Sequence, residues 1–233
     1  MAVWTIVPAA GVGSRMQANR PKQYLNLLGK TVIEHTLELF LGHERISGVI
    51  VAISPEDPYW PELSVSRQPR LAKVEGGSER CHSVLKALTY LENQGIDPGD
   101  WVLVHDAARP CLRPADLDYL INEVTLAGQG GILAVPVRDT MKQADDDSRH
   151  ISRTVDRSHL WHALTPQMFR LGELRQAIEA ALNDGFVVTD DASAMEHAGQ
   201  HPLLVRGHAD NLKITIPEDL ALAEFYLRRR TWA

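Results

Sequence analysis

Residues 3–16 read V-W-T-I-V-P-A-A-G-V-G-S-R-M, and this stretch decides the fold class. Residues 3–7 are apolar or β-branched, and Pro8 and Gly11 end the run, so a short buried strand is predicted. The small residues that follow form a loop at the carboxyl end of that strand, which is where open α/β sheets bind ligands. Gly11 and Gly13 allow close backbone approach, so that N–H groups can point at phosphate oxygens.

Outward from this loop, the chain alternates predicted strands with predicted helices. The further strands are the runs at residues 48–53, 72–75, 101–104 and 131–137, with edge strands at 202–206 and 211–216. The predicted helices lie at 31–41, from 78–79 onward, and at 114–126, 171–182, 189–198 and 218–229. Helices between strands imply βαβ units joined by right-handed crossovers. The predicted fold class is therefore α/β, a Rossmann-like, mainly parallel sheet with helices on both faces.

The alternation stops at residues 138–160, which are polar. Two alternating segments flank an acidic tip at Asp145, Asp146 and Asp147, and this pattern predicts a β-hairpin that projects from the body. A floppy surface insertion is the alternative. No repeat or linker interrupts the rest of the chain, so residues 1–233 are predicted to form one domain with 138–160 as an arm.

Charge and composition exclude several classes of protein. A formal net charge of −6 and a pI near 5.9 argue against a nucleic-acid coat protein. No run approaches the ~18 apolar residues of a membrane span, and the N-terminal apolar run is too short and lacks the basic residues of a signal peptide. Cys81 and Cys111 are too few for a disulfide scaffold, so reduced thiols and a cytoplasmic location are expected.

Three kinds of phosphate loop compete for residues 7–16. A dinucleotide-binding loop needs a third glycine where Met16 stands, and the residue order of a P-loop is absent. A plain tight turn would account for the glycines alone. The full pattern is Gly-x-Gly-x-Arg-Met with Lys22, preceded by Pro21, seven residues after Arg15. It resembles the N-terminal loop of nucleotidyltransferases, which bind a nucleoside triphosphate and release pyrophosphate.

Seven more motifs follow in order along the chain. They are G-G-S-E-R-C-H-S at residues 76–83, V-H-D-A-A-R-P at 104–110, P-V-R-D-T-M-K at 136–142, T-V-D-R at 154–157, L-W-H-A-L-T-P-Q at 160–167, T-D-D-A at 189–192 and N-L-K-I-T at 211–215. Together with the loop, the series resembles the 2-C-methyl-D-erythritol 4-phosphate cytidylyltransferases of the non-mevalonate isoprenoid pathway. The resemblance covers the chain from Val3 to about Tyr226.

The resemblance implies a role for each motif residue. Arg15 and Lys22 would hold the triphosphate and stabilise the transition state, and Arg157 and Lys213 would position the methylerythritol phosphate. The residues expected around CTP are Ala9, Ala10, Gly11, Gly13, Gly77, Ser78, Ser83 and Asp106. Those expected around the acceptor are Asp106, Arg109, Thr140, Arg157, Thr165, Thr189 and Lys213. Ser78 stands where the resemblance leads us to expect an Asp, so one contact to the base or ribose is expected to differ here.

The chemistry of the residues agrees with this reaction. The acceptor phosphate is an anion at pH 7, so its attack on the α-phosphorus needs alignment and charge neutralisation rather than a strong base. Magnesium is expected as counter-charge, held mainly by the nucleotide, and no protein metal ligands are assigned. His159 and His162 lack further ligands at zinc spacing, and His105 is interpreted as a packed histidine.

Two other functions stay open at this point. An enzyme with the same chemistry could use another acceptor, such as ribitol 5-phosphate, and a nucleotide-sensing module could bind CTP without turnover. Cations on both sides of the α-phosphate argue against a sensor. We also expect a homodimer in which the 138–160 arm completes the partner's site, because an isolated two-stranded hairpin is marginal in water.

Overall fold

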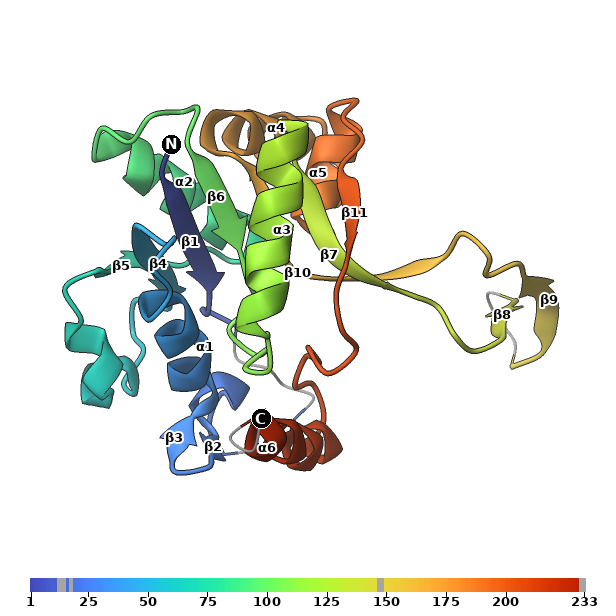
Figure 1. The fold of residues 1–233 in the computed structure, drawn as a ribbon, viewed down its shortest axis with the longest axis horizontal. Helices are drawn as coiled ribbons and strands as arrows, with labels where there is room; N and C mark the ends of the chain where they lie inside the picture. The colour runs from blue at the N-terminus through green and yellow to red at the C-terminus, as the bar shows by residue number, and fades with distance from the viewer. Residues whose placement is uncertain (12–15, 17–18, 146–148, 231–233) are drawn as a thin grey trace.

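A computed structural model describes residues 1–11, 16, 19–145 and 149–230. Within them, the body is built on a seven-stranded sheet (Figure 1). In spatial order its strands are β11 (Leu203–Arg206), β7 (Gly131–Pro136), β10 (Trp161–Arg170), β6 (Trp101–Val104), β1 (Val3–Pro8), β4 (Gly48–Ile53) and β5 (Leu71–Glu75). All neighbouring pairs are parallel except those of β10, which runs antiparallel to β6 and β7. The predicted mainly parallel α/β sheet is confirmed.

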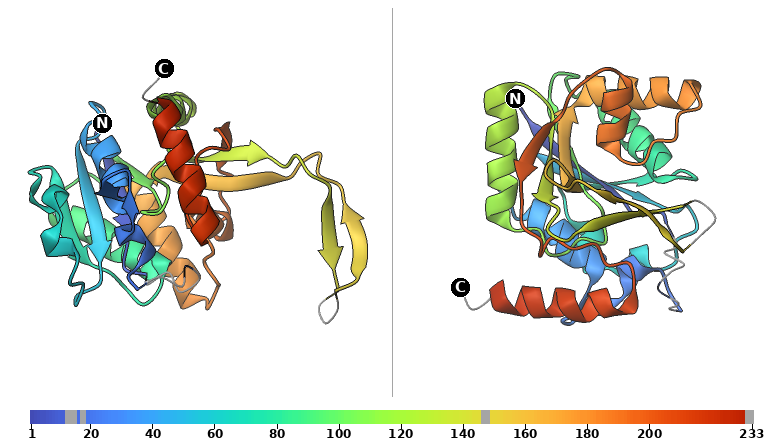
Figure 2. Two further views of the ribbon diagram at one scale, coloured as in Figure 1. Left: turned by 90° about the horizontal axis from the view of Figure 1, so that it is seen from below. Right: turned by 90° about the vertical axis from the view of Figure 1, so that its right-hand side faces the viewer.

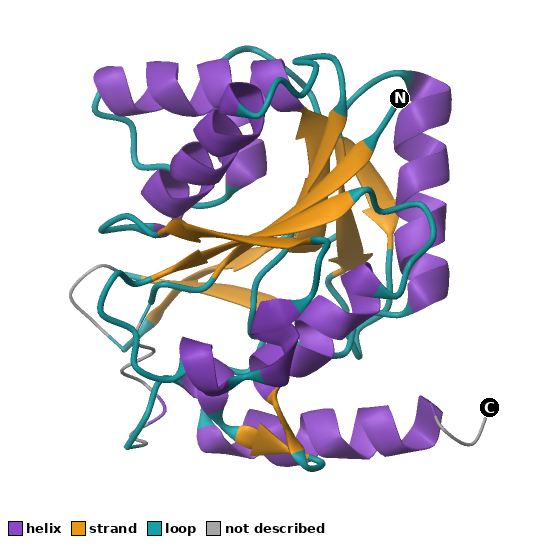
Figure 3. Ribbon diagram, turned by 90° about the vertical axis from the view of Figure 1, so that its left-hand side faces the viewer, coloured by secondary structure: helices purple, strands orange, loops and turns teal. Residues whose placement is uncertain are grey.

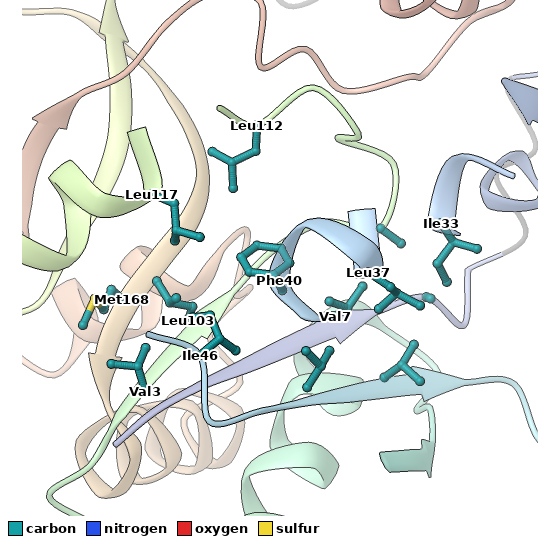
Figure 4. Close-up of a cluster of buried hydrophobic side chains, with 14 of the residues drawn as sticks. Val3, Val7, Ile33, Leu37, Phe40, Ile46, Leu103, Leu112, Leu117 and Met168 are labelled. Carbon is teal, nitrogen blue, oxygen red and sulfur yellow. The ribbon is translucent and has the colours of Figure 1, made fainter. Parts of the chain in front are cut away.

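Helices cover both faces of the sheet (Figure 3). The first face carries α1 (Val32–Leu41) and α3 (Pro114–Ala127), and the second carries α2 (Arg80–Asn93), α4 (Leu171–Asn183) and α5 (Asp191–His197). On the first face, Phe40 and Leu37 of α1 pack against Val7 and Leu103 of the sheet (Figure 4). None of these four side chains is exposed. The strands read as continuous apolar runs because both of their faces are buried.

The last helix, α6 (Pro217–Arg230), lies beyond the carboxyl end of β1 (Figure 1). It closes a third apolar cluster, in which Ala223 packs with Met16, Leu27 and Ile214. The segment after β1 also contains the 3-10 helix η2 (Lys22–Tyr24) and a small hairpin of β2 (Asn26–Leu27) and β3 (Lys30–Thr31). Two further 3-10 helices, η3 (Trp60–Glu62) and η4 (Ser64–Arg67), precede β5. None of the helices in the described ranges combines the length and apolarity of a bilayer crossing.

Two expectations about strands are wrong. The expected edge strand at 211–216 does not form, because the backbone groups of this segment bond elsewhere: Ile214 N–H donates to Ala108, and Thr215 N–H to the Asp219 carboxylate. Conversely, β10 was not predicted. Its ladder shifts register between Ala163 and Gln167, where Pro166 lacks an N–H and follows a cis peptide bond. These interruptions hide the strand pattern.

The predicted hairpin is confirmed in the described residues. Strands β8 (Met141–Ala144) and β9 (Ile151–Val155) form a separate two-stranded antiparallel sheet that extends well away from the body (Figures 1 and 2). Every residue of the two strands except Val155 is exposed. Asp146 and Asp147 of the predicted tip lie outside the described residues. The arm therefore has almost no apolar core of its own within this chain.

Candidate active site

A cleft opens where β1, β6 and the start of α2 meet. About 680 Å³ of it is free of protein atoms, a figure that includes space open to solvent. Its lining residues are Pro8, Ala9, Ala10, Gly11, Lys22, Gln23, Gly77, Ser78, Glu79, Arg80, Ser83, Asp106, Ala107, Ala108 and Lys213. Nine of the residues expected to bind substrates therefore line one cleft at the carboxyl ends of parallel strands, where ligands bind in such sheets.

One wall of the cleft is built by backbone that packs unusually closely. A Cβ atom on Gly76 would lie 2.2 Å from the Cβ of Ala10, and one on Gly77 would lie 2.3 Å from the Cβ of His82. The Ser83 hydroxyl accepts a hydrogen bond from Gly77 N–H at 2.9 Å, which ties this wall to α2. Glycine is required here because the two chain segments touch.

Gln23 holds the loop after β1 in place. Its side-chain amide donates to the carbonyls of Ala9 at 2.8 Å and Gly11 at 3.0 Å, and only 4% of the residue is exposed. These bonds hold Ala9 and Gly11 in place where they line the cleft. Sequence reasoning missed Gln23, although it follows the lysine of the Pro-Lys motif directly.

Three cations surround Asp106 at the end of β6. Its carboxylate lies 2.8 Å from Lys213 Nζ, 3.0 Å from Arg80 Nε and 3.5 Å from Arg109 Nε. Burial alone would raise the pKa of Asp106, but Arg80, Lys213 and Arg109 outweigh it and hold the pKa well below its usual range. Asp106 is therefore ionised at neutral pH, and the cluster as a whole is positive, as an anionic substrate requires.

A chain of hydrogen bonds lies behind Asp106. Asp106 N–H donates to the Thr165 hydroxyl at 3.2 Å, and that hydroxyl lies 3.0 Å from His105 Nδ1. His105 Nε2 lies 3.0 Å from the Arg109 carbonyl. A carbonyl can only accept, so Nε2 carries the proton and Nδ1 accepts from Thr165. Burial lowers the pKa of His105 to about 4, so the ring is a neutral, packed spacer at pH 7.

Two further contacts bring the C-terminal motif to the cleft. Lys22 Nζ donates to the Ile214 carbonyl at 2.8 Å, which places the lysine beside the segment that carries Lys213. The fully buried Asn211 donates to the Thr165 carbonyl at 2.7 Å, and its own carbonyl accepts from Arg109 at 2.7 Å. Asn211 belongs to a motif that sequence reasoning quoted, but only Lys213 was given a role there.

Of the other expected residues that the structure describes, none except Ser78 lines the cleft. Gly13 and Arg15 are outside the described residues. Thr140 and Arg157 are exposed on the arm, Thr140 directly before β8 and Arg157 shortly after β9. Thr189 is exposed just before α5. Ser78 lies at the cleft, and its hydroxyl is 3.0 Å from His82 Nδ1. Thr140, Arg157 and Thr189 are thus not among the residues that line the cleft.

The described residues do not offer a good magnesium site. The Asp106 oxygens already contact three cations. The one cluster of potential ligands among the described residues is Glu79, Cys81 and His82. It contains a buried thiol, whose pKa burial raises, and an imidazole, whereas magnesium prefers oxygen ligands. The donor set does not fit a magnesium ion held by the protein alone.

Comparisons with known proteins decide the family. The model of the 2-C-methyl-D-erythritol 4-phosphate cytidylyltransferase family matches residues 3–229. The chain belongs to this family. A 2-C-methyl-D-erythritol 4-phosphate cytidylyltransferase of Pseudomonas putida strain GB-1 is 55% identical over 232 of the 233 residues of this chain, and the match covers 96% of the relative. One of Vibrio cholerae is 58% identical over 224 residues, 96% of this chain and 95% of the relative.

Solved structures of 2-C-methyl-D-erythritol 4-phosphate cytidylyltransferases share the whole fold. The enzyme of Francisella tularensis superimposes with a TM-score of 0.84 at 35% identity, covering 97% of this chain and 100% of that one. A 4-diphosphocytidyl-2C-methyl-D-erythritol synthase gives a TM-score of 0.83 at 40% identity, covering 97% and 98%. The chain is thus a nucleotidyltransferase of the cytidylyl-transferring class, and a non-catalytic nucleotide sensor is excluded.

Proposed function

We propose that this protein transfers the cytidylyl group of CTP to 2-C-methyl-D-erythritol 4-phosphate. The products are 4-diphosphocytidyl-2-C-methyl-D-erythritol and pyrophosphate, and the reaction belongs to isoprenoid precursor biosynthesis. The observation that carries the proposal is the family match over residues 3–229. The positive cluster around Asp106 in the cleft supports it, because both substrates are anions.

The reaction needs one bond to form and one to break. A phosphate oxygen of the acceptor attacks the α-phosphorus of CTP, and the bond from that phosphorus to the pyrophosphate oxygen breaks. The attacking oxygen is already an anion, so no general base is required. Arg15 and Lys22 neutralise the charge that moves to the leaving group, and Lys213 and Arg157 position the phosphate of the acceptor. The Ile214 carbonyl, which accepts from Lys22 at 2.8 Å, keeps that lysine next to the Lys213 segment.

The close-packed wall supports a pyrimidine nucleotide. Gly76 and Ala10 touch, so the slot between the loop after β1 and α2 has small side chains and accessible backbone groups. Such a slot suits cytosine better than a purine. In this proposal the residues around CTP are Ala9, Ala10, Gly11, Gly13, Gly77, Ser78, Ser83 and Asp106.

The acceptor side combines two parts of the protein. The body provides Asp106, Arg109, Thr165, Thr189 and Lys213. Thr140 and Arg157 sit on the arm, away from the cleft of their own chain, and we propose that a two-fold homodimer brings each arm to the partner's site. The arm's exposed strands support this, since an isolated hairpin is marginal in water. The planar fork of Arg157 suits a phosphate.

Subunit mixing tests the exchanged arm. Arg157→Ala and Lys22→Ala chains are inactive alone in this proposal, but a mixed dimer contains one site with both lesions and one intact site. Partial recovery of activity on mixing supports arm exchange. No recovery despite demonstrated mixing, or a fully active monomer at assay concentration, contradicts it.

Magnesium and location complete the proposal. We propose that Mg²⁺ enters with CTP, held mainly by the phosphates, where it would supply counter-charge. Cys81 and Cys111 are not joined in a disulfide, which suits a reducing compartment and supports a cytoplasmic location.

Pyrophosphate release tests the choice of acceptor. The assay contains the protein, CTP and Mg²⁺ with 2-C-methyl-D-erythritol 4-phosphate, with ribitol 5-phosphate, or with neither. Release that depends on the methylerythritol phosphate is expected. Equal or faster release with ribitol 5-phosphate would contradict the proposed substrate while leaving the chemistry intact.

A further inference from the structure

One guanidinium joins segments that are far apart in the sequence. Arg80, the first residue of α2, donates from Nε to Asp106 at 3.0 Å and from Nη2 to Asp191 at 2.8 Å. Asp106 follows β6, and Asp191 is the first residue of α5. Thr189, which the proposed function places on the acceptor side, precedes Asp191 by two residues. Arg80 also lines the cleft, so the link runs beside the proposed nucleotide site.

We propose that Arg80 and Asp191 are a positioning pair that holds the beginning of α5, and with it Thr189, in place relative to Asp106. The pair would act on acceptor binding through the residues it positions. This inference rests on the proposed function, because the acceptor role of Thr189 belongs to that proposal. Neither Arg80 nor Asp191 was assigned a role from the sequence.

The burial of Asp191 shows why the pair must stay together. Asp191 has no exposed surface, and its Oδ1 atom has no hydrogen-bond partner among the described residues. Burial raises the pKa of Asp191, and the Arg80 charge acts in the opposite direction. A buried carboxylate needs a paired cation or a proton, so its contact with Arg80 fixes where the start of α5 can lie.

A second side chain holds the same turn to the sheet. Gln167 of β10 donates to the Asp190 carboxylate at 2.8 Å and accepts from Ala192 N–H at 2.8 Å. Asp190 also caps α5 by accepting from Ser193 N–H. These contacts attach α5 to β10, whereas the hydrogen bond from Arg80 to Asp191 attaches the start of α5 to the start of α2. Loss of Arg80 should therefore shift α5 without unfolding it.

The close-packed wall of the cleft, formed by Gly76, Gly77 and Ala10 and here called the nucleotide wall, does not depend on this pair. Ser83 holds Gly77 N–H at 2.9 Å, and Gln23 holds the carbonyls of Ala9 and Gly11. None of these bonds involves Arg80 or Asp191. Breaking the pair should therefore weaken the acceptor's binding much more than that of CTP, a split that a general loss of stability would not produce.

Steady-state kinetics with CTP and 2-C-methyl-D-erythritol 4-phosphate tests the pair. Arg80→Met and Asp191→Asn are each expected to raise the KM of the acceptor about tenfold or more, the usual size of the effect of losing a hydrogen bond between charged groups. In Asp191→Asn, whose side chain does not line the cleft, the KM of CTP should change less than about threefold. The acceptor KM of the double variant should be no higher than that of the more impaired single variant, because the two residues act as a unit.

Arg175→Met is the matched control. Arg175 of α4 also bridges two carboxylates, with Nε 2.9 Å from Glu92 at the far end of α2 and Nη1 2.5 Å from Glu179, but it does not line the cleft. Both KM values should stay at the wild-type level in this variant.

Three results would overturn the positioning pair. They are an acceptor KM within twofold of wild type in Asp191→Asn, equal rises of both KM values in that variant, and additive effects in the double variant. Asp191→Asn keeps the size of the side chain and decides the question if Arg80→Met does not fold. A wild-type protein that used only another polyol phosphate would overturn the proposed acceptor instead, and the same comparison would then be made with that compound.

Discussion

Gly76→Ala tests how tightly the nucleotide wall is built. The new Cβ would lie 2.2 Å from the Cβ of Ala10, while ordinary contact begins at 3.4 Å, so the two segments must separate by about 1.2 Å. The atoms in the way are a rigid methyl group and backbone, with the Ser83 hydroxyl 3.3 Å away. A misplacement of about 1 Å in a reactive complex costs about 10²-fold in rate. We therefore expect kcat/KM for CTP to fall about 10²-fold.

The assay measures initial rates of pyrophosphate release over a range of CTP concentrations at saturating acceptor. Urea unfolding of the same variant should show a loss of about 1–3 kcal/mol, typical of overpacking, so that the protein stays folded in the assay. Gly207→Ala is the control, because its Cβ would meet only Leu133 side-chain atoms at 3.6 Å or more. A Gly76→Ala enzyme with kcat/KM within twofold of wild type would refute the close-packed wall.

Three further predictions concern charge, pH and the nucleotide. Lys22→Ala should lower kcat by about 10²–10³-fold and raise the KM of CTP much less, measured by steady-state kinetics, because its charge acts mainly on the leaving group. The pKa of His105 is lowered to about 4 in the folded protein, whereas that of an unfolded histidine is near 6.5. The unfolded state therefore gains its proton first as the pH falls. This difference should lower the free energy of unfolding by about 3 kcal/mol between pH 6.5 and pH 4. Urea unfolding at pH 7 and pH 4.5 should show that His105→Gln loses less unfolding free energy on acidification than the wild type does. Asp191, whose pKa is raised, acts in the opposite direction, but it is present in both proteins and so cancels in the comparison. CTP should support turnover far better than ATP or GTP; comparable rates with a purine nucleotide would contradict the small-walled slot.

The local sequence was enough for most of the sheet and its helices. The buried strands β1, β4, β6 and β7 have uninterrupted apolar runs, and each is followed by a loop or helix signal that ends it. The arm was also predictable, because alternation and an acidic tip are local features. The missed strand β10 shows the limit, since Pro166 and the register shift break its pattern and its pairing with β6 and β7 is set by the sheet.

The site divides in the same way. Glycine, lysine and arginine residues in a loop after a strand indicate a phosphate site. Lys22 and the residues of the loop could therefore be proposed from the sequence as phosphate-binding residues. The contacts of Arg80 could not, because Asp106 and Asp191 lie 26 and 111 residues away and meet it only in the folded chain. Likewise, the tautomer of His105 follows from its two partners and not from its neighbours in the sequence.

Phosphorus NMR of the reaction products tests the central proposal most directly. The protein is incubated with Mg²⁺, CTP and 2-C-methyl-D-erythritol 4-phosphate, and the phosphorus signals are followed with time. For each CTP consumed, we expect one pyrophosphate and one cytidine diphosphate ester linked to the methylerythritol, with the acceptor's monoester signal lost in equal amount. Pyrophosphate accompanied by CMP, or an unchanged acceptor signal, would contradict cytidylyl transfer.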